Sequence, residues 1–308
     1  MHIELDITLA SGSAQYGVII TGDRLEEYKV KSETAVIEQT DAQGRRTSHR
    51  YQRDGRQWDG PQGLSPIMDD QSLALTALGG AEPFKALADA LSGVAVYSVF
   101  PDKLRVPQRF DVSHPMKKHG DNWLSILRKL VRDDSAKDDL IAGLNKLTGD
   151  IEDVRVISAA GHLIAEFKHE ARAKQGKRWF DASQQSDGTL RVAGLLTALL
   201  QSPSVPVVGI EEPELTVHPG ALPMLYDYLK QASTVSQVIV TTHSPIMLDL
   251  VDHEKDVVFV VNRRDGKTDV RRVDDPQLKP VRDKLLRLGD LFSSGDLQLS
   301  LFQDQDER

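Results

Sequence analysis

The sequence predicts an α/β protein with an antiparallel β lobe at its N-terminus, a small helical insert, and a mostly parallel sheet in its C-terminal part. Three observations lead to this prediction. Apolar and polar residues alternate near the N-terminus, apolar residues have helical spacing in the middle of the chain, and strand and helix patterns alternate after residue 185. Alternating strands and helices are typical of a parallel sheet covered by helices.

The first 53 residues have the pattern of a β meander. Ile3, Leu5 and Ile7 alternate with polar residues, which is the period of a strand with one buried face. Further strands are predicted at 16–21, 27–32, 34–39 and 46–53. Residues 54–81 are rich in Gly, Pro, Asp and Gln and are predicted to form a loop. We therefore expect an antiparallel sheet with one face in water.

The middle of the chain combines helices with a hairpin. Leu124, Leu127 and Leu130 recur on one helical face, which predicts a helix over 121–131. The other elements expected here are a helix at 83–91, a buried strand at 94–97, a helix at 136–147, and a hairpin of strands 150–157 and 162–169.

Strands and helices alternate in the last part of the chain. The predicted elements are helix 189–200, strand 205–210, helix 222–232, strand 237–241, helix 245–251, a hairpin of strands 257–262 and 269–273, and helix 279–288. The resulting domain prediction is a β-rich first part over 1–120, a helical insert over 121–149, an α/β lobe over 150–302, and a polar tail over 303–308.

Composition narrows the class of protein. The chain has 308 residues, of which 40% are hydrophobic and 27% charged, as expected for a globular protein with a sizeable core. The absence of cysteine excludes disulfides, thiolate zinc sites and cysteine nucleophiles. No apolar run approaches the ~20 residues of a membrane span and no signal-peptide pattern opens the chain, so we expect a cytoplasmic location. The net charge of −8 lacks the basic surplus typical of nucleic-acid binders.

Two adjacent acids, Glu211 and Glu212, follow the apolar strand at 205–210. Ligands of open α/β sheets bind at the carboxyl ends of strands. One carboxylate there can hold Mg²⁺, which prefers oxygen ligands, and the next can orient or deprotonate an attacking water. The alternative interpretation is a strand that ends in solvated acids without a ligand.

His243 follows the next buried strand and precedes a short predicted helix. A histidine at this position can donate a hydrogen bond to a phosphate or hold the attacking water. It can equally serve as a cap of the helix that follows.

The turn Ser186-Asp187-Gly188-Thr189 opens a predicted helix. A helix N-terminus offers free backbone N–H groups and a positive dipole end, which together suit phosphate. An ordinary N-cap without a ligand explains the same residues.

The order and spacing of these three segments resemble those of ABC-type ATPase heads, in the SMC, RecF and OLD-like group of predicted AAA-family ATPases. Ser186-Asp187-Gly188-Thr189 resembles the signature motif, Ile210-Glu211-Glu212-Pro213-Glu214 the Walker B strand end, and Thr242-His243-Ser244-Pro245 the switch-histidine motif. The resemblance is specific over about residues 183–250 and only topological before residue 170. It implies the fold of an ABC-type P-loop NTPase head.

The resemblance also implies a role for each residue. Glu211 would be the metal-associated acid, Glu212 the catalytic carboxylate, and His243 the sensor of the γ-phosphate. The turn at 186–189 would contact ATP bound on a second subunit. ATP and Mg²⁺ would therefore lie in the interface of a homodimer.

Two further features concern the nucleotide. Gln108 is the candidate for the Q-loop glutamine. The P-loop G-x-x-x-x-G-K-[ST] is missing, because Gly266-Lys267-Thr268 has Val261 where the first glycine is needed and has the pattern of a hairpin turn. An N-terminally incomplete chain, a natural short form without ATP binding, and a P-loop supplied by another polypeptide all remain open. The intact acids and histidine favour the incomplete chain.

The leading functional interpretation is an ATPase, acting as a dimerising clamp or motor for a partner protein. By resemblance such a protein takes part in DNA repair or phage defence, with DNA as a candidate partner and no membrane. The alternative is a nucleotide-dead protein-interaction module derived from the same fold. A nuclease effector is a third interpretation, but only about 60 residues follow His243, which is short for a nuclease domain.

Overall fold

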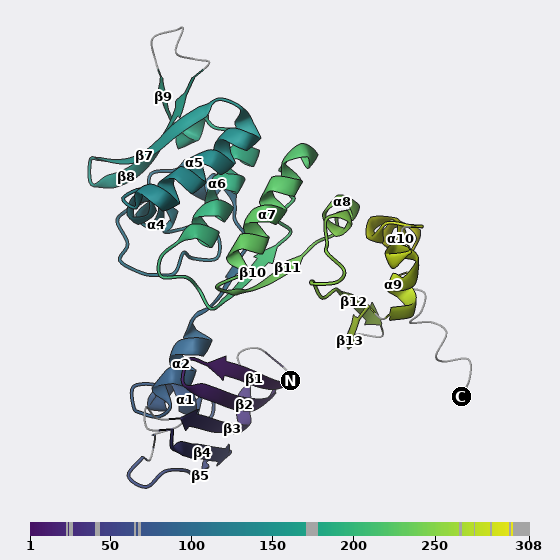
Figure 1. Ribbon diagram of the computed structural model, residues 1–308. Helices are drawn as coiled ribbons and strands as arrows, with labels where there is room; N and C mark the ends of the chain where they lie inside the picture. Colours follow the sequence, from purple (N-terminus) through teal and green to yellow (C-terminus); the bar gives the residue numbers. More distant parts are fainter. Residues whose placement is uncertain are drawn as a thin grey trace. The chain divides into compact units, whose positions relative to one another are not determined.

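The structure of the protein is a computed structural model (Figure 1). It describes residues 1–22, 24, 27–40, 44–64, 66, 69–170, 178–264, 267–273, 275–283, 285–295 and 297. The chain divides into two units, Met1–Val94 and Ala95–Arg308. The boundary between the units lies at residue 94, before the predicted domain boundary at residue 120. The reason is that the segment after Val94 joins the sheet and the helices of the second unit.

The first unit is built on a five-stranded antiparallel meander. Its strands are β1 (His2–Leu9), β2 (Gly12–Thr21), β3 (Lys29–Thr40), β4 (Arg46–Asp54) and β5 (Gln57–Asp59), and they pair in this order. Helices α1 (Ala74–Leu78) and α2 (Lys85–Ser92) contribute Leu75 and Leu87 to the core that covers one sheet face, and Phe84, the N-cap of α2, joins them there. The predicted antiparallel lobe is confirmed.

One long strand, β3, replaces the two short strands predicted at 27–32 and 34–39, and Glu33 lies where the break between them was predicted. The polar residue interrupts the apolar pattern within β3, yet it is completely buried. Its carboxylate accepts hydrogen bonds from the hydroxyls of Tyr16 (3.1 Å) and Tyr51 (2.7 Å) and from the N–H groups of Ala74 (2.6 Å) and Leu75 (2.9 Å). Glu33 thereby caps α1 from the sheet, because the first N–H groups of a helix lack partners within it.

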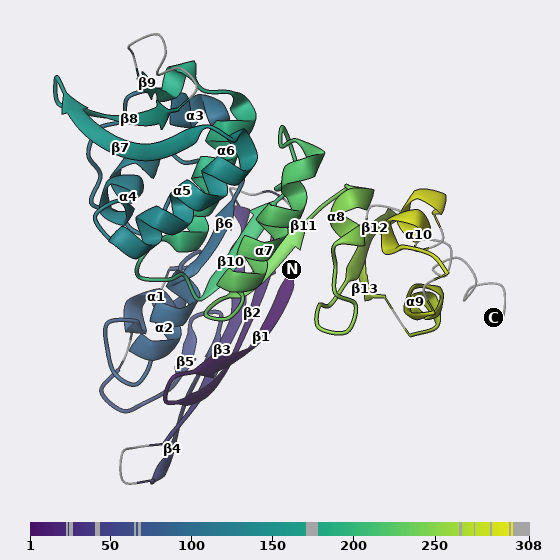
Figure 2. The same cartoon turned by 45° about the horizontal axis from the view of Figure 1, so that its top comes forward.

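The sheet of the second unit carries the strand ends of interest. Its order is β11 (Gln237–Thr241), β10 (Val207–Glu211), β6 (Val94–Tyr97), and β10 runs parallel to β11. Both views show these two strands side by side, with α7 (Leu222–Ala232) over them (Figures 1 and 2). Val208 and Ile210 belong to the core shared with α6 (Asp187–Leu200) and α7. The predicted parallel arrangement of these two strands is confirmed.

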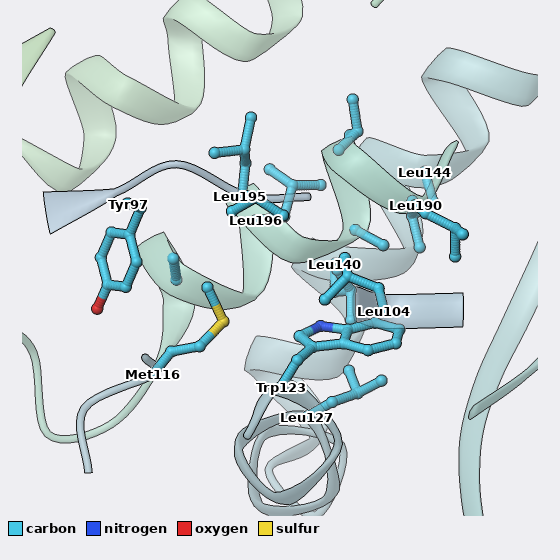
Figure 3. Close-up of a cluster of buried hydrophobic side chains, with 14 of the residues drawn as sticks. Tyr97, Leu104, Met116, Trp123, Leu127, Leu140, Leu144, Leu190, Leu195 and Leu196 are labelled. Atoms are coloured by element: carbon cyan, nitrogen blue, oxygen red, sulfur yellow. The ribbon is translucent and has the colours of Figure 1, made fainter. Parts of the chain in front are cut away.

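A helical layer and a second antiparallel sheet complete this core. The elements are α3 (Pro101–Arg105), α4 (Trp123–Leu130), α5 (Asp134–Thr148), β7 (Ile151–Ala159), β8 (His162–His169), β9 (Trp179–Asp181) and the 3₁₀ turn η3 (Ala182–Gln184). The indole of Trp123 is completely buried among leucines and donates to Thr197 Oγ1 at 3.0 Å (Figure 3). The expected helical pair and hairpin are therefore present, and β9 adds a third strand.

The last described elements are α8 (Pro245–Asp249), β12 (Phe259–Arg264), β13 (Lys267–Arg272), α9 (Asp275–Arg282) and α10 (Leu288–Ser294). The hairpin interpretation of the Gly-Lys-Thr segment is confirmed for the described residues, because Lys267 and Thr268 lie in β13 and pair with β12. The helix predicted at 279–288 is wrong: α9 ends at Arg282, and a separate helix begins at Leu288. The predicted tail at 303–308 and Gly266 lie outside the described residues. Within the described part, no helix is long and apolar enough to span a membrane.

Candidate active site

The two acids and the histidine lie at one edge of the parallel sheet. Glu211 is the last residue of β10 and stands in register with Thr241, the last residue of β11. The backbone N–H of the following residue, Glu212, donates to the Thr241 carbonyl at 2.9 Å. His243 follows two residues after Thr241. The structure thus brings these three residues together, as expected from strand ends that meet at the same edge.

The backbone at Glu212 is strained. Its φ of 45° lies in the left-handed region, which residues with a Cβ rarely adopt. Such strain persists only where surrounding contacts impose it, and it concentrates at functional sites. The turn directs the chain away from β10 as soon as the strand ends, so Glu212 differs in backbone geometry from Glu211.

Glu211 pairs with a cation. Its carboxylate contacts Lys118 Nζ at 3.0 Å, and hydrogen bonds from Lys118 and Ser98 lower the pKa of the Glu211 carboxyl. The side chain is 42% exposed, so solvent screens this pair. An ionised, accessible carboxylate suits Mg²⁺, which commonly takes one or two protein carboxylates together with substrate phosphates. Among the described residues no cluster of three acids, histidines or cysteines could hold a metal alone.

Removal of the Lys118 charge is expected to raise the pKa of Glu211. In Lys118→Met, the carboxyl should titrate nearer the ordinary glutamate value of about 4.3, because its main hydrogen-bond donor is lost. The pair stabilises the fold above the unfolded-state pKa, and this small contribution disappears as the pH falls through the lower folded-state pKa. Carboxyl-carbon NMR titration measures the shift. Lys129→Met is the control, because Lys129 Nζ contacts the Ser202 carbonyl instead; an unchanged Glu211 pKa in Lys118→Met would contradict the pairing.

Glu214 connects the loop after β10 to the loop after β11. Its Oε1 atom accepts hydrogen bonds from Thr242 Oγ1 at 2.6 Å and from the His243 N–H at 3.2 Å. Ser244 caps α8 by accepting from the Met247 N–H. The backbone of His243 is therefore held on both sides, while its imidazole is exposed. The histidine does not cap the helix; the serine that follows it does.

The turn at 186–189 forms the N-terminus of α6. Ser186 is the N-cap, and its Oγ accepts the Thr189 N–H at 3.1 Å. Asp187 is exposed and forms an ion pair with Arg105, whose guanidinium also donates to the Gln185 carbonyl at 3.0 Å. The ordinary N-cap is thus present, and it leaves the exposed Ser186 and Asp187 at the surface of the unit.

Gly188 has a packing reason to be glycine. A Cβ at this position would lie 2.6 Å from the carbonyl oxygen of Thr216, in the loop between β10 and the 3₁₀ turn η4 (Pro219–Ala221). Thr216 itself has a positive φ of 61°. The start of α6 and the loop that carries the acids therefore touch through backbone atoms.

Gly188→Ala is expected to destabilise the second unit by about 1–3 kcal/mol, because a rigid backbone atom occupies the space that the methyl needs. Alanine is favoured over glycine within a helix, so local propensity alone predicts the opposite sign. Urea denaturation measures the change. Gly80→Ala is the control, because its Cβ would meet no atom within 4 Å. A stabilised Gly188→Ala would contradict the close approach.

Arg191 is a site residue that the sequence reasoning missed. It lies on α6, is only 3% exposed, and donates to the backbone carbonyls of Val99, Glu211 and Glu212. Its signal in the sequence is a lone arginine at the start of the apolar run 190–200. A buried guanidinium is costly unless its donors are satisfied, so such a residue indicates fixed partners.

Gln108 lies in the interior of the second unit, and its Q-loop role stays a prediction. Its side chain is 8% exposed and donates to the carbonyls of Lys103 (3.0 Å) and Gly120 (2.8 Å), while its oxygen accepts the Leu124 N–H at 2.9 Å. Both amide hydrogens are occupied by these contacts. In this arrangement the hydrogen bonds of the side chain are all made to backbone groups of the protein.

The fold and this edge define an α/β protein with an acidic pair and a histidine at the carboxyl ends of parallel strands. The family of AAA domains described as "putative AbiEii toxin, Type IV TA system" matches residues 47–249, which include all three motifs. Because this match covers more than half of the chain, the protein belongs to that family. Membership confirms the predicted ABC/AAA-like ATPase head.

Solved structures that the chain resembles include SMC heads. The chain is 14% identical to the SMC head domain from Thermotoga maritima, with a TM-score of 0.37, covering 86% of this chain and 75% of that one. It is 13% identical to the Smc head domain with an extended coiled coil from Pyrococcus furiosus, solved with the C-terminal domain of ScpA, with a TM-score of 0.46 and coverages of 89% and 79%. No curated protein matches the chain.

Proposed function

We propose that this protein is the part of an ATP-hydrolysing head that supplies the catalytic acids, the γ-phosphate sensor and the signature turn. The observation that carries the proposal is the register of Glu211 with Thr241, which sets the acids and His243 at one sheet edge. Glu212 is the proposed catalytic carboxylate and His243 the proposed sensor. Family membership supports nucleotide chemistry at this edge.

Glu211 is the proposed ligand of Mg²⁺. Its ionised carboxylate offers oxygen atoms to the metal. Lys118 would release its contact with one carboxylate oxygen or move away when the metal binds. The metal, when bound, would neutralise charge on the phosphates. Glu212 would then orient the attacking water or accept its proton.

For this function a P-loop from another polypeptide segment would be needed, because the chain contains no G-x-x-x-x-G-K-[ST] sequence. The same fact favours a second candidate function, a protein-interaction module that no longer binds nucleotide. Mg·ATP binding distinguishes the ATPase from the interaction module. A ligand that binds the native state raises the midpoint temperature of thermal unfolding. We expect a raised midpoint when the chain is joined to a P-loop-bearing segment of a family member. An unchanged midpoint there supports the interaction module.

The proposed assembly is a homodimer in which the turn at 186–189 contacts ATP bound by the other subunit. The exposure of Ser186 and Asp187 at the start of α6 supports this arrangement. The proposed context is a cytoplasmic clamp or motor for a partner protein, in DNA repair or phage defence. A DNA-binding role would make retention on DNA strongly salt-dependent.

Mixing of two inactive variants tests the shared site. In the joined protein, Glu212→Gln removes the acid and Ser186→Arg blocks the signature turn, so each homodimer is inactive. A mixed dimer contains one composite site in which both residues are intact, and partial ATP hydrolysis should return. If the mixture stays inactive although mixed dimers form, the proposal that two subunits share the site is wrong.

A further inference from the structure

The guanidinium of Arg191 occupies an unusual position for a charged group. It is 97% buried and belongs to a helix whose neighbouring residues are apolar. Burial lowers the pKa of the Arg191 guanidinium, while the nearby Glu214 and Glu212 act to raise it. An arginine side chain stays protonated in proteins, so this charge is compensated by the backbone carbonyls around it.

These carbonyls belong to the ends of two neighbouring strands. Arg191 Nη1 donates to the carbonyl of Val99, just after β6, at 2.6 Å. Nη2 donates to the carbonyls of Glu212 at 2.8 Å and Glu211 at 3.3 Å, at the end of β10. A planar guanidinium presents its donors in a fixed fork, so three carbonyls bound to it have little freedom to rotate. The guanidinium therefore fixes the peptide group that follows the strained residue Glu212.

Glu214 makes the corresponding contact on the other side of the site. Its Oε1 atom holds the Thr242 hydroxyl and the His243 N–H, which fixes the loop after β11. Two buried side-chain atoms lack a hydrogen-bond partner within the described residues, and they are Arg191 Nε and Glu214 Oε2. The two side chains are near enough for the Glu214 charge to raise the pKa of Arg191. The buried Arg191 and the half-buried Glu214 thus each hold one of the loops that carry the candidate site residues.

We infer that Arg191 is a positioning residue that holds the backbone of Glu211 and Glu212, and that Glu214 supports it by holding the backbone of His243. Because Arg191 lies on α6 three residues after Gly188, the same helix presents the signature turn and fixes the acids. A displacement of the start of α6 is therefore transmitted directly to Glu212. The catalytic meaning of this link rests on the proposed function, whereas the link itself does not.

Amide hydrogen exchange tests the link in the chain itself. Arg191→Lys keeps the charge and removes the fork. We expect the Glu212 amide and its neighbours in 211–216 to exchange about tenfold faster relative to the core of α6 and α7, as loss of a charged hydrogen bond predicts. Thr197→Val is the matched control, because Thr197 is equally buried on α6 and its hydroxyl bonds Ala193 and Trp123. A uniform rise in exchange in both variants would overturn the inference.

Two further measurements test the inference. If Arg191→Lys does not fold, ¹⁵N NMR of the wild-type guanidinium decides: separate Nη resonances support a fixed fork, and one averaged signal overturns it. In the joined ATPase, Arg191→Lys should lower kcat and leave KM for Mg·ATP unchanged, while Thr197→Val changes neither. Absence of ATP hydrolysis by the wild type contradicts the proposed function alone, since the exchange result is independent of it.

Discussion

Glu212→Gln is expected to reduce ATP hydrolysis by about 10²–10⁴-fold in the protein joined to a P-loop-bearing segment, with Mg·ATP binding retained. Glutamine has nearly the same shape as glutamate but cannot accept a proton from water. The backbone of residue 212 is held through its own N–H and carbonyl, at 2.9 Å to Thr241 and 2.8 Å to Arg191. The substitution therefore leaves the turn in place and changes only the side-chain chemistry.

Phosphate release under single-turnover conditions measures this effect, and the Mg·ATP-induced shift of the thermal midpoint measures binding. Glu254→Gln is the matched control, because Glu254 is an exposed acid of the same unit. Wild-type turnover in Glu212→Gln would show that another group activates the water. Loss of binding together with turnover would show instead that Glu212 contributes to holding the nucleotide.

Glu33→Leu is expected to destabilise the first unit by at least about 3 kcal/mol. The substitution leaves two tyrosine hydroxyls and two N–H groups of α1 buried without their acceptor. Burial beside Glu33 raises the pKa of both the Tyr16 and the Tyr51 hydroxyl, so these groups remain proton donors at neutral pH. Removal of the shared acceptor therefore affects four donors together.

Denaturation in urea, followed by hydrogen exchange of the first unit, measures this loss. Tyr16→Phe is the control, because it removes one of the four hydrogen bonds and should cost about 1 kcal/mol. Exchange in residues 95–297 should change little, since Glu33 belongs to the core of the other unit. Equal losses from both substitutions would mean that Glu33 acts through one bond only.

The strand ends could be predicted from the sequence because their signals are local. The strand before Glu211 and the strand before His243 are continuous apolar runs, and each ends abruptly in polar residues. Neighbouring parallel strands end at the same sheet edge, so the meeting of these residues follows from the pattern. The predicted burial of the second strand is wrong, because β11 has no buried residue and Ile239 is 52% exposed. The confirmed antiparallel lobe rests on the same kind of signal, the alternation of Ile3, Leu5 and Ile7 with polar residues.

The buried polar groups could not be predicted, because their partners are distant in sequence. Arg191 binds the carbonyl of Val99, 92 residues away, and Glu33 binds the N–H of Leu75, 42 residues away. The spacing of apolar residues carries no information about such pairs. The contacts of Gln108 could not be predicted for the same reason: its three backbone partners come together only once the chain is folded.

The most direct test of the central claim is ATP turnover by the protein joined to a P-loop-bearing segment, compared with the chain alone. The claim is that the edge formed by Glu211, Glu212 and His243 hydrolyses ATP. We expect turnover in the joined protein and none in the chain alone, because the phosphates need the P-loop to be held at this edge. A joined protein that binds Mg·ATP, dimerises and yet shows no turnover would contradict the claim.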